Sequence, residues 1–178
     1  MNILNEVIRE HSKRNTIRVS EIIAGNKRLL SQIIDFVMDK DMEISRKSAW
    51  VMRCCYENNP ESLDPYLSLL IRHLKKNAIH DAVKRNILGI LKTAVLPDKE
   101  KGNLVNICFR FLGSASEPVS VKAFSMDILF RIGTNEPSIL NELRIIIEDQ
   151  IPYGSGGFKS KGQRIITEII RKHSNDVQ

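Results

Sequence analysis

The sequence predicts an all-α fold, an α-solenoid of about five antiparallel helix pairs. The main observation is a repeat, because Lys84 lies 38 residues after Arg46 and 38 residues before Lys122. A fixed period of this length is typical of stacked helix pairs. No stretch alternates between apolar and polar residues as a strand would, and six prolines with nine glycines are few helix breakers for 178 residues. Six further rows of apolar or small residues repeat at the same step: Ala49, Ile87 and Ser125; Met52, Ile90 and Ile128; Trp50, Leu88 and Met126; Leu67, Val105 and Leu143; Leu69, Ile107 and Ile145; Ile71, Phe109 and Ile147.

The individual helices follow from apolar residues at helical spacing and from the stop signals between them. Gly25 tolerates the left-handed conformation that ends a helix, and Pro60 disfavours helix at the residue before it. These signals predict helices over residues 2–11, 12–25, 29–39, 43–56, 63–75, 80–94, 101–112, 118–132 and 139–148, and a last helix through Ile165 and Ile170.

Residues 152–162 form the one stretch expected to be irregular. Gly154, Gly156 and Gly157 fall within four residues, and glycine is unfavourable in a helix interior. With Lys159 and Lys161, its backbone amides could hold a phosphate group; the alternative is a plain connection between repeats. The glycine-lysine-serine order of a P-loop is absent.

Composition limits the classes of function. A hydrophobic content of 42% with 27% charged residues is typical of a folded globular chain. No apolar run approaches the roughly 18 residues of a membrane span, and the N-terminal residues resemble no signal peptide, so we expect a cytoplasmic protein without membrane contact. Three cysteines without metal-ligand spacing predict buried or half-buried thiols, with no metal and no cofactor. The net charge of +6 permits an anionic partner.

Helix pairs of this length resemble HEAT repeats when the second helix opens with an apolar–basic doublet and carries a small residue three positions later. Val83-Lys84 and Val121-Lys122 are such doublets, Ile44-Ser45-Arg46 is a looser one, and Ala49 and Ser125 are the small residues. The strings over 11–15, 80–86, 117–126 and 154–162 also resemble a small bacterial HEAT-like family. The resemblance to HEAT repeats covers residues 2–173.

The resemblance implies a HEAT- or armadillo-like superhelix whose second helices line a concave face. In such solenoids the basic residue of the doublet often pairs with an acid of the neighbouring repeat. We expect a single domain over 1–178, with repeats of roughly 2–25, 26–60, 61–96, 97–134 and 135–174.

A helical wheel of residues 80–94 separates a core face from a basic face. At 100° per residue, Val83, Ile87, Ile90 and Ala94 cluster as the core, whereas Arg85 points to solvent. Arg14 and Lys47 share the Arg85 position by repeat matching, and Lys13, Arg46 and Lys122 share the flanking position of Lys84.

These cations lie near helix N-termini, where the helix dipole disfavours positive charge. Either local acids such as Glu43, Asp81 and Glu117 offset them, or the row binds an anion. The candidate binding residues are therefore Lys13, Arg14, Arg46, Lys47, Lys84, Arg85, Lys122, Lys159 and Lys161.

Two functions compete on this evidence. The first is a non-enzymatic binding or scaffold module that engages a protein partner through a basic concave face. The alternative is a nucleic-acid-binding protein resembling HEAT-like DNA glycosylases, in which concave lysines and arginines hold phosphates, and Trp50 and Asp127 would stand for the aromatic and acidic residues of those enzymes. Trp50 shares a row with Leu88 and Met126, which favours a packing role. No catalytic constellation can be assembled from the spacing, so we do not expect an enzyme.

Overall fold

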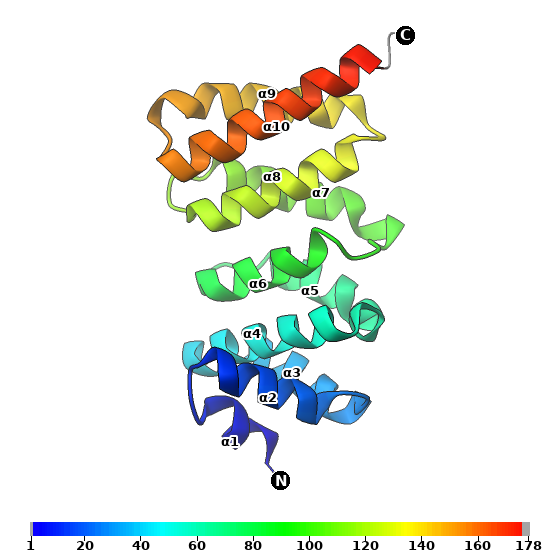
Figure 1. Ribbon diagram of the computed structural model, residues 1–178, viewed down its shortest axis with the longest axis vertical. Helices are drawn as coiled ribbons and strands as arrows, with labels where there is room; N and C mark the ends of the chain where they lie inside the picture. Colours follow the sequence, from blue (N-terminus) through cyan, green and yellow to red (C-terminus); the bar gives the residue numbers. More distant parts are fainter. Residues whose placement is uncertain (1, 176–178) are drawn as a thin grey trace. The chain divides into compact units, whose positions relative to one another are not determined.

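The computed structural model describes residues 2–175, so residue 1 and residues 176–178 of the predicted domain lie outside the described part. Within it the chain forms ten α-helices and two short 3-10 helices, without a strand (Figure 1). Successive helices pack as pairs: α1 with α2, α3 with α4, α5 with α6, α7 with α8, and α9 with α10. The predicted all-α class is confirmed.

The chain divides into two compact units, unit 1 up to Pro97 and unit 2 from Asp98. Unit 1 contains α1 (Ile3–Ile8), α2 (Lys13–Ile23), α3 (Lys27–Val37), α4 (Met42–Asn58), the 3-10 helix η1 (Pro60–Tyr66), α5 (Leu67–His73) and α6 (Asp81–Leu91). Unit 2 contains α7 (Asp98–Gly113), α8 (Val119–Gly133), α9 (Pro137–Gln150), the 3-10 helix η2 (Ile151–Tyr153) and α10 (Gly156–Asn175).

Helix α4 is the centre of unit 1, because it packs against α1, α2, α3 and α6. The Asp41 side chain caps its start by accepting hydrogen bonds from the backbone amides of Glu43 and Ile44, which satisfies amides that the helix itself leaves free. Met52 on α4 and Ile87 and Ile90 on α6 are fully buried. Val83 of α6 and Ala94, which follows the end of that helix at Leu91, are buried as well, so the predicted core residues are confirmed as buried.

The segment 63–75 differs from its prediction as one helix. Residues 60–66 form the 3-10 helix η1, and the α-helix begins only at Leu67. Pro65 lies inside η1, and its ring removes the amide hydrogen that an α-helix would use there. The apolar spacing predicted a helix over this segment but not the 3-10 turn that contains Pro65.

Unit 2 corrects the expectation of an irregular stretch over 152–162. Helix α10 already begins at Gly156, so Gly157, Lys159, Lys161 and Gly162 are helical. Packing overrides the low helix propensity here. A Cβ atom on Gly162 would lie 2.7 Å from Ile147 Cγ2 of α9, which shows that α10 approaches α9 closely at this glycine. Buried Phe158 anchors the first turn.

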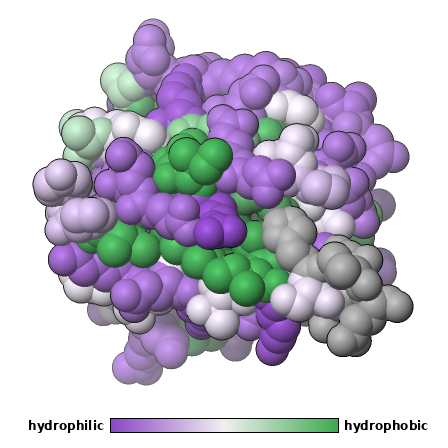
Figure 2. Space-filling model, turned by 90° about the horizontal axis from the view of Figure 1, so that it is seen from above, coloured by the Kyte–Doolittle hydropathy of each residue, from purple (hydrophilic) through white to green (hydrophobic). Residues whose placement is uncertain are grey.

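Figure 2 looks onto the side of unit 2 formed by α9 and α10, where apolar side chains lie among hydrophilic ones. Ile145 and Ile170 are the large apolar side chains of these two helices that are exposed. Apolar atoms contribute a large share of any protein surface, so this face alone identifies no partner.

Candidate functional site

A groove between α4 and α6 of unit 1 brings several predicted and unpredicted polar residues together. Arg46, Trp50, Arg53 and Glu57 follow one another on α4 at steps of four, three and four residues, which places them on one helix face. We call this cavity of about 540 Å³ the arginine groove; it is lined by His11, Arg46, Trp50, Arg53, Glu57, Ala82, Arg85 and Asn86.

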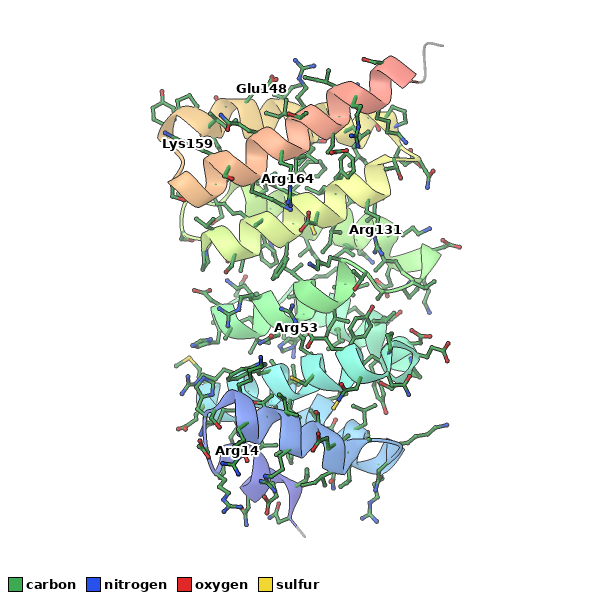
Figure 3. The ribbon with its side chains drawn as sticks, viewed as in Figure 1. Arg14, Arg53, Arg131, Glu148, Lys159 and Arg164 are labelled. Carbon is green, nitrogen blue, oxygen red and sulfur yellow. The ribbon has the colours of Figure 1, made fainter. Side chains whose placement is uncertain are left out.

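Small residues on α6 keep the arginine groove open. Ala82 lines it, and a Cβ atom on Gly89 would lie 2.6 Å from Nη1 of Arg53. The Arg53 guanidinium therefore rests against the backbone of α6, between the two helices (Figure 3). Its Nε donates a hydrogen bond of 3.0 Å to Glu57 Oε1, so the charge of Arg53 is balanced within α4.

Arg46 and Arg85 differ from Arg53 because neither forms an ion pair or a hydrogen bond with another described residue. Arg46 is half-buried and Arg85 is exposed. The Trp50 ring lies between the positions of Arg46 and Arg53 on α4, is half-buried, and meets the His11 ring edge-on at 5.3 Å between centroids. The groove thus presents two unpaired guanidinium groups beside an accessible aromatic surface.

The electrostatics of the groove favour an anion. Partial burial lowers the pKa of His11, and the positive charges of Arg46 and Lys47 lower it further against a smaller opposing effect of Glu43. The contribution of Arg46 and Lys47, which comes after that of burial, reflects the positive charge at this end of the groove. Three arginines against the single carboxylate of Glu57 give the lining a positive balance.

Lys47 corrects the prediction of a solvated row formed by Arg14, Lys47 and Arg85. Its side chain is buried, with Nζ donating to the Ile8 carbonyl at 2.8 Å and pairing with Glu43 Oε1 at 2.8 Å. The reason is α1, which packs on α4 and offers a free carbonyl near its C-terminal end. The hydrogen bond from Lys47 lowers the pKa of Glu43.

Lys84 pairs with Asp81 of its own helix at 3.3 Å. Lys84 and Lys47 therefore each have a local acidic partner, which is one of the two alternatives predicted for the basic row. Lys13 and Arg14 are exposed on α2 and do not line the arginine groove. Figure 3 shows the position of Arg14 on α2.

In unit 2 the candidate lysines have partners or lie along α10. Lys122 Nζ donates to Gln150 Oε1 at 3.1 Å and lies 5.6 Å from the centre of the Phe158 ring. Lys161 forms an ion pair with Asp127 of α8, which occupies the carboxylate considered as a glycosylase-like acid. Lys159 is half-buried near the start of α10, so the stretch considered either as a phosphate-binding loop or as a plain connection is helical from Gly156 onward.

The sequence reading missed His11, Arg53 and Asn86 as groove residues. Arg53 had a detectable signal, because Arg46 and Arg53 flank Trp50 at positions that share its helix face. Asn86 is buried and donates from Nδ2 to the Ala82 carbonyl at 2.9 Å. No sequence pattern predicts this contact.

All three cysteines are free thiols, with Cys54 half-buried and Cys55 and Cys108 buried, as predicted. Burial raises the pKa of both Cys55 and Cys108 to about 12, so these two thiols stay protonated and unreactive at neutral pH. Within residues 2–175 no three histidine, cysteine, aspartate or glutamate side chains gather as potential metal ligands. None of the described helices has the length and apolar character needed to span a membrane.

Comparison with known proteins identifies the family. The model of a family described as HEAT repeat domain matches residues 3–169. No curated protein and no solved structure matches the chain. The match spans all ten helices in whole or in part, and with it the predicted α-solenoid of about five helix pairs is confirmed. The chain belongs to the HEAT repeat domain family.

Proposed function

We propose that the protein is a non-enzymatic binding module that takes an acidic segment of a partner protein into the arginine groove. HEAT repeats generally mediate protein interactions. The observation that carries the proposal is the pair Arg46 and Arg85, which line one groove from two helices, form no ion pair among the described residues, and lie beside half-buried Trp50.

The chemistry of these side chains supports a carboxylate-bearing ligand. A guanidinium group donates two parallel hydrogen bonds to a carboxylate, a geometry that lysine lacks. An arginine already paired inside the protein would have to give up that partner, whereas Arg46 and Arg85 have none to lose. Tryptophan and arginine are the residue types that dominate binding energy in protein interfaces.

The paired cations elsewhere give a useful contrast. Lys47, Lys84 and Lys161 each have an acidic partner within the protein, so we assign them to the stability of the fold. The proposal accordingly narrows the nine candidate residues to Arg46 and Arg85, with Arg53 and Trp50 added.

Nucleic acid is the second candidate, since guanidinium groups also bind phosphates and bases stack on exposed aromatic rings. The groove offers only two unpaired arginines, which favours a short acidic peptide over a long phosphate backbone. A direct comparison of both ligands decides between them.

The test uses Trp50, the only tryptophan of the chain, as a fluorescent reporter inside the groove. The full chain is titrated with a peptide rich in aspartate and glutamate that carries one aromatic residue, and separately with duplex and single-stranded oligonucleotides. The variant is the double substitution Arg46→Ala and Arg85→Ala. Lys13→Ala with Arg14→Ala is the matched control, because it removes two exposed charges from outside the groove.

We expect the peptide to change Trp50 fluorescence with a Kd below about 1 mM at roughly 50 mM salt, where charge pairing is weakly screened. The groove variant should weaken binding at least tenfold, since each lost charge-assisted hydrogen bond is worth about 1.5–3 kcal/mol, and the control should leave it within about twofold. Absence of peptide binding would contradict the proposal. Oligonucleotide binding whose log–log salt slope flattens by about two in the groove variant would establish the nucleic-acid alternative instead.

A further inference from the structure

The arginine groove contains more positive charge than its own residues neutralise. Arg46, Arg53 and Arg85 line it, and Glu57 is the one carboxylate among its described lining residues. The Arg53 Nε donates to Glu57 Oε1 at 3.0 Å, so the charges of these two residues balance each other within α4. Arg46 and Arg85 form no ion pair with any residue that the structure describes. Two guanidinium charges, one from each helix, are therefore left for a ligand.

The acids at the starts of α4 and α6 do not supply the missing negative charge. Glu43 pairs with Lys47 at 2.8 Å, and Asp81 pairs with Lys84 at 3.3 Å. The pKa of Glu43 is lowered first by the hydrogen bond from Lys47 and then by the charge of Lys47, with a smaller effect of Arg46. Each of these acids is thus the partner of a lysine on its own helix.

The two remaining charges select the kind of anion. A carboxylate carries one negative charge, so a single carboxylate neutralises one of the two arginines. A phosphate monoester carries a charge of about −1.5 to −2 at pH 7 and has three acceptor oxygens, so it can accept hydrogen bonds from Arg46 and Arg85 together. The groove volume of about 540 Å³ is that of one small-molecule site, about 300–1,000 Å³, so one bound group can be near both side chains.

Trp50 indicates what carries the phosphate. It follows Arg46 by about one helical turn on α4 and is half-buried at the groove, where its aromatic surface can pack against a side chain next to the phosphate. A free phosphate ion brings no such side chain, and a nucleic-acid backbone brings several phosphates to a groove with two uncompensated charges. These features favour a phosphorylated segment of a protein.

We propose that the acidic segment taken up by the arginine groove carries a phosphorylated side chain, whose phosphate group is held by Arg46 and Arg85 together. This inference rests on the proposed function and names the chemistry of its ligand. An aromatic residue of the segment packs against Trp50, while Arg53 keeps its partner Glu57. The two free arginines act as a unit, because each donates to oxygens of the same group.

The experiment titrates the full chain with three peptides that differ at one central position, which is phosphoserine, glutamate or serine. The flanking residues are identical and include further acids and one aromatic residue other than tryptophan, so that Trp50 fluorescence reports binding. We expect the phosphoserine peptide to bind at least about tenfold more tightly than the glutamate peptide, because its phosphate accepts additional charge-assisted hydrogen bonds. The glutamate peptide should bind more tightly than the serine peptide by a smaller factor.

Substitutions of the two arginines test whether they hold one group. Arg46→Ala and Arg85→Ala should each reduce the preference for phosphoserine over glutamate to less than about threefold, and the double variant should reduce it little further, since residues that contact the same group are coupled. Arg85→Lys keeps the charge but loses the planar fork, so it should retain part of the preference. Lys13→Ala with Arg14→Ala is the matched control and should leave the preference within about twofold, because a charge outside the groove acts on both peptides alike.

Equal affinities for the phosphoserine and glutamate peptides would overturn this inference, as would a preference that both single variants leave unchanged. Binding of the glutamate peptide in either case would still support the proposed function, whereas failure of all three peptides to bind would contradict both. Inorganic phosphate is added as a competitor, and we expect it to displace the phosphoserine peptide only far above the Kd of that peptide. Displacement near that Kd would show that free phosphate, and not a phosphorylated segment, is the ligand.

Discussion

Unit 1 and unit 2 contain residues of the same basic row of the repeat, but the surroundings of their charges differ between the arginine groove of unit 1 and the lysines of unit 2. Arg46 and Lys122 are 76 residues apart, two steps of the 38-residue period. Arg46 forms no ion pair with any residue that the structure describes and lines an open groove, whereas Lys122 donates to Gln150 and lies over the Phe158 ring. Lys161 of the same unit pairs with Asp127.

The difference comes from the neighbouring helix. In unit 2, α9 and α10 present Gln150 and Phe158 to Lys122, so its charge is used inside the fold. In unit 1, α6 presents Ala82 and Gly89 towards α4, which leaves space and offers no acid. A repeat position therefore fixes the helix face of a residue, and the adjoining repeat decides whether its charge stays available for a ligand.

The largest expected effect tests whether α6 has a core side and a ligand side. Ile90 is fully buried, so Ile90→Ala should destabilise the protein by about 2–5 kcal/mol through lost burial and a residual cavity. Arg85→Ala, on the exposed side of the same helix, should change stability by less than about 0.5 kcal/mol. Denaturant midpoints of the two variants measure this, and equal losses would show that Arg85 has a structural role.

An intermediate effect compares the paired cation of unit 2 with the unpaired one of unit 1. The side chains of Lys161 and Asp127 are exposed by only 12% and 29%, so Lys161→Ala should cost about 1–3 kcal/mol by leaving a partly buried carboxylate unpaired. Arg46→Ala should cost less than about 0.5 kcal/mol.

A double-mutant cycle of Lys161→Ala with Asp127→Asn isolates the interaction, and we expect a coupling of about 0.5–3 kcal/mol. A coupling near zero would contradict the distinction between structural and available cations.

The smallest expected effect concerns Gly89, which gives the Arg53 guanidinium its place against α6. Gly89→Ala should stabilise the protein by less than about 1 kcal/mol, because the gain in helix propensity is reduced by the displacement of Arg53. The same change should weaken binding of the acidic peptide severalfold. Thermal unfolding and Trp50 fluorescence measure the two effects.

Gly102 of α7 is the matched control, since a Cβ atom there would meet nothing within 4 Å. Gly102→Ala should show the full propensity gain of about 0.5–1 kcal/mol without affecting the groove. Were Gly89→Ala to stabilise as much as Gly102→Ala and leave peptide binding unchanged, the close contact between Arg53 and α6 would have no role in the groove.

Part of the candidate site was predictable from the sequence. Arg46 and Arg85 were predicted as binding candidates, and the wheel placed Arg85 on the exposed side. Trp50 was expected to pack in the core or between repeats; it is half-buried at the groove and meets the His11 ring, whereas Leu88 and Met126 of the same row are fully buried. The rows of the repeat alone do not give this difference in burial, because each repeat meets a different neighbour.

The sequence by itself determined the all-α class, the succession of helix pairs, the core face of α6 and the HEAT family. The first three follow from apolar spacing of 3.6 residues and from glycine and proline signals, which act within one or two helical turns, whereas the family was indicated by the resemblance of the apolar–basic doublets and small residues to HEAT repeats. Packing overrode these local signals at the start of α10, where Gly162 lets that helix approach α9.

Only the tertiary structure decided which cations are available and where the cavities lie. Lys47 is buried because α1, 39 residues away in sequence, supplies the Ile8 carbonyl, and Arg46 lines an open groove because α6 offers it no acid. A charge in water gains little from one exposed partner but must be paired when buried. Whether a cation is paired or available to a ligand therefore depends on contacts between helices far apart in the chain, and such contacts leave no period in the sequence.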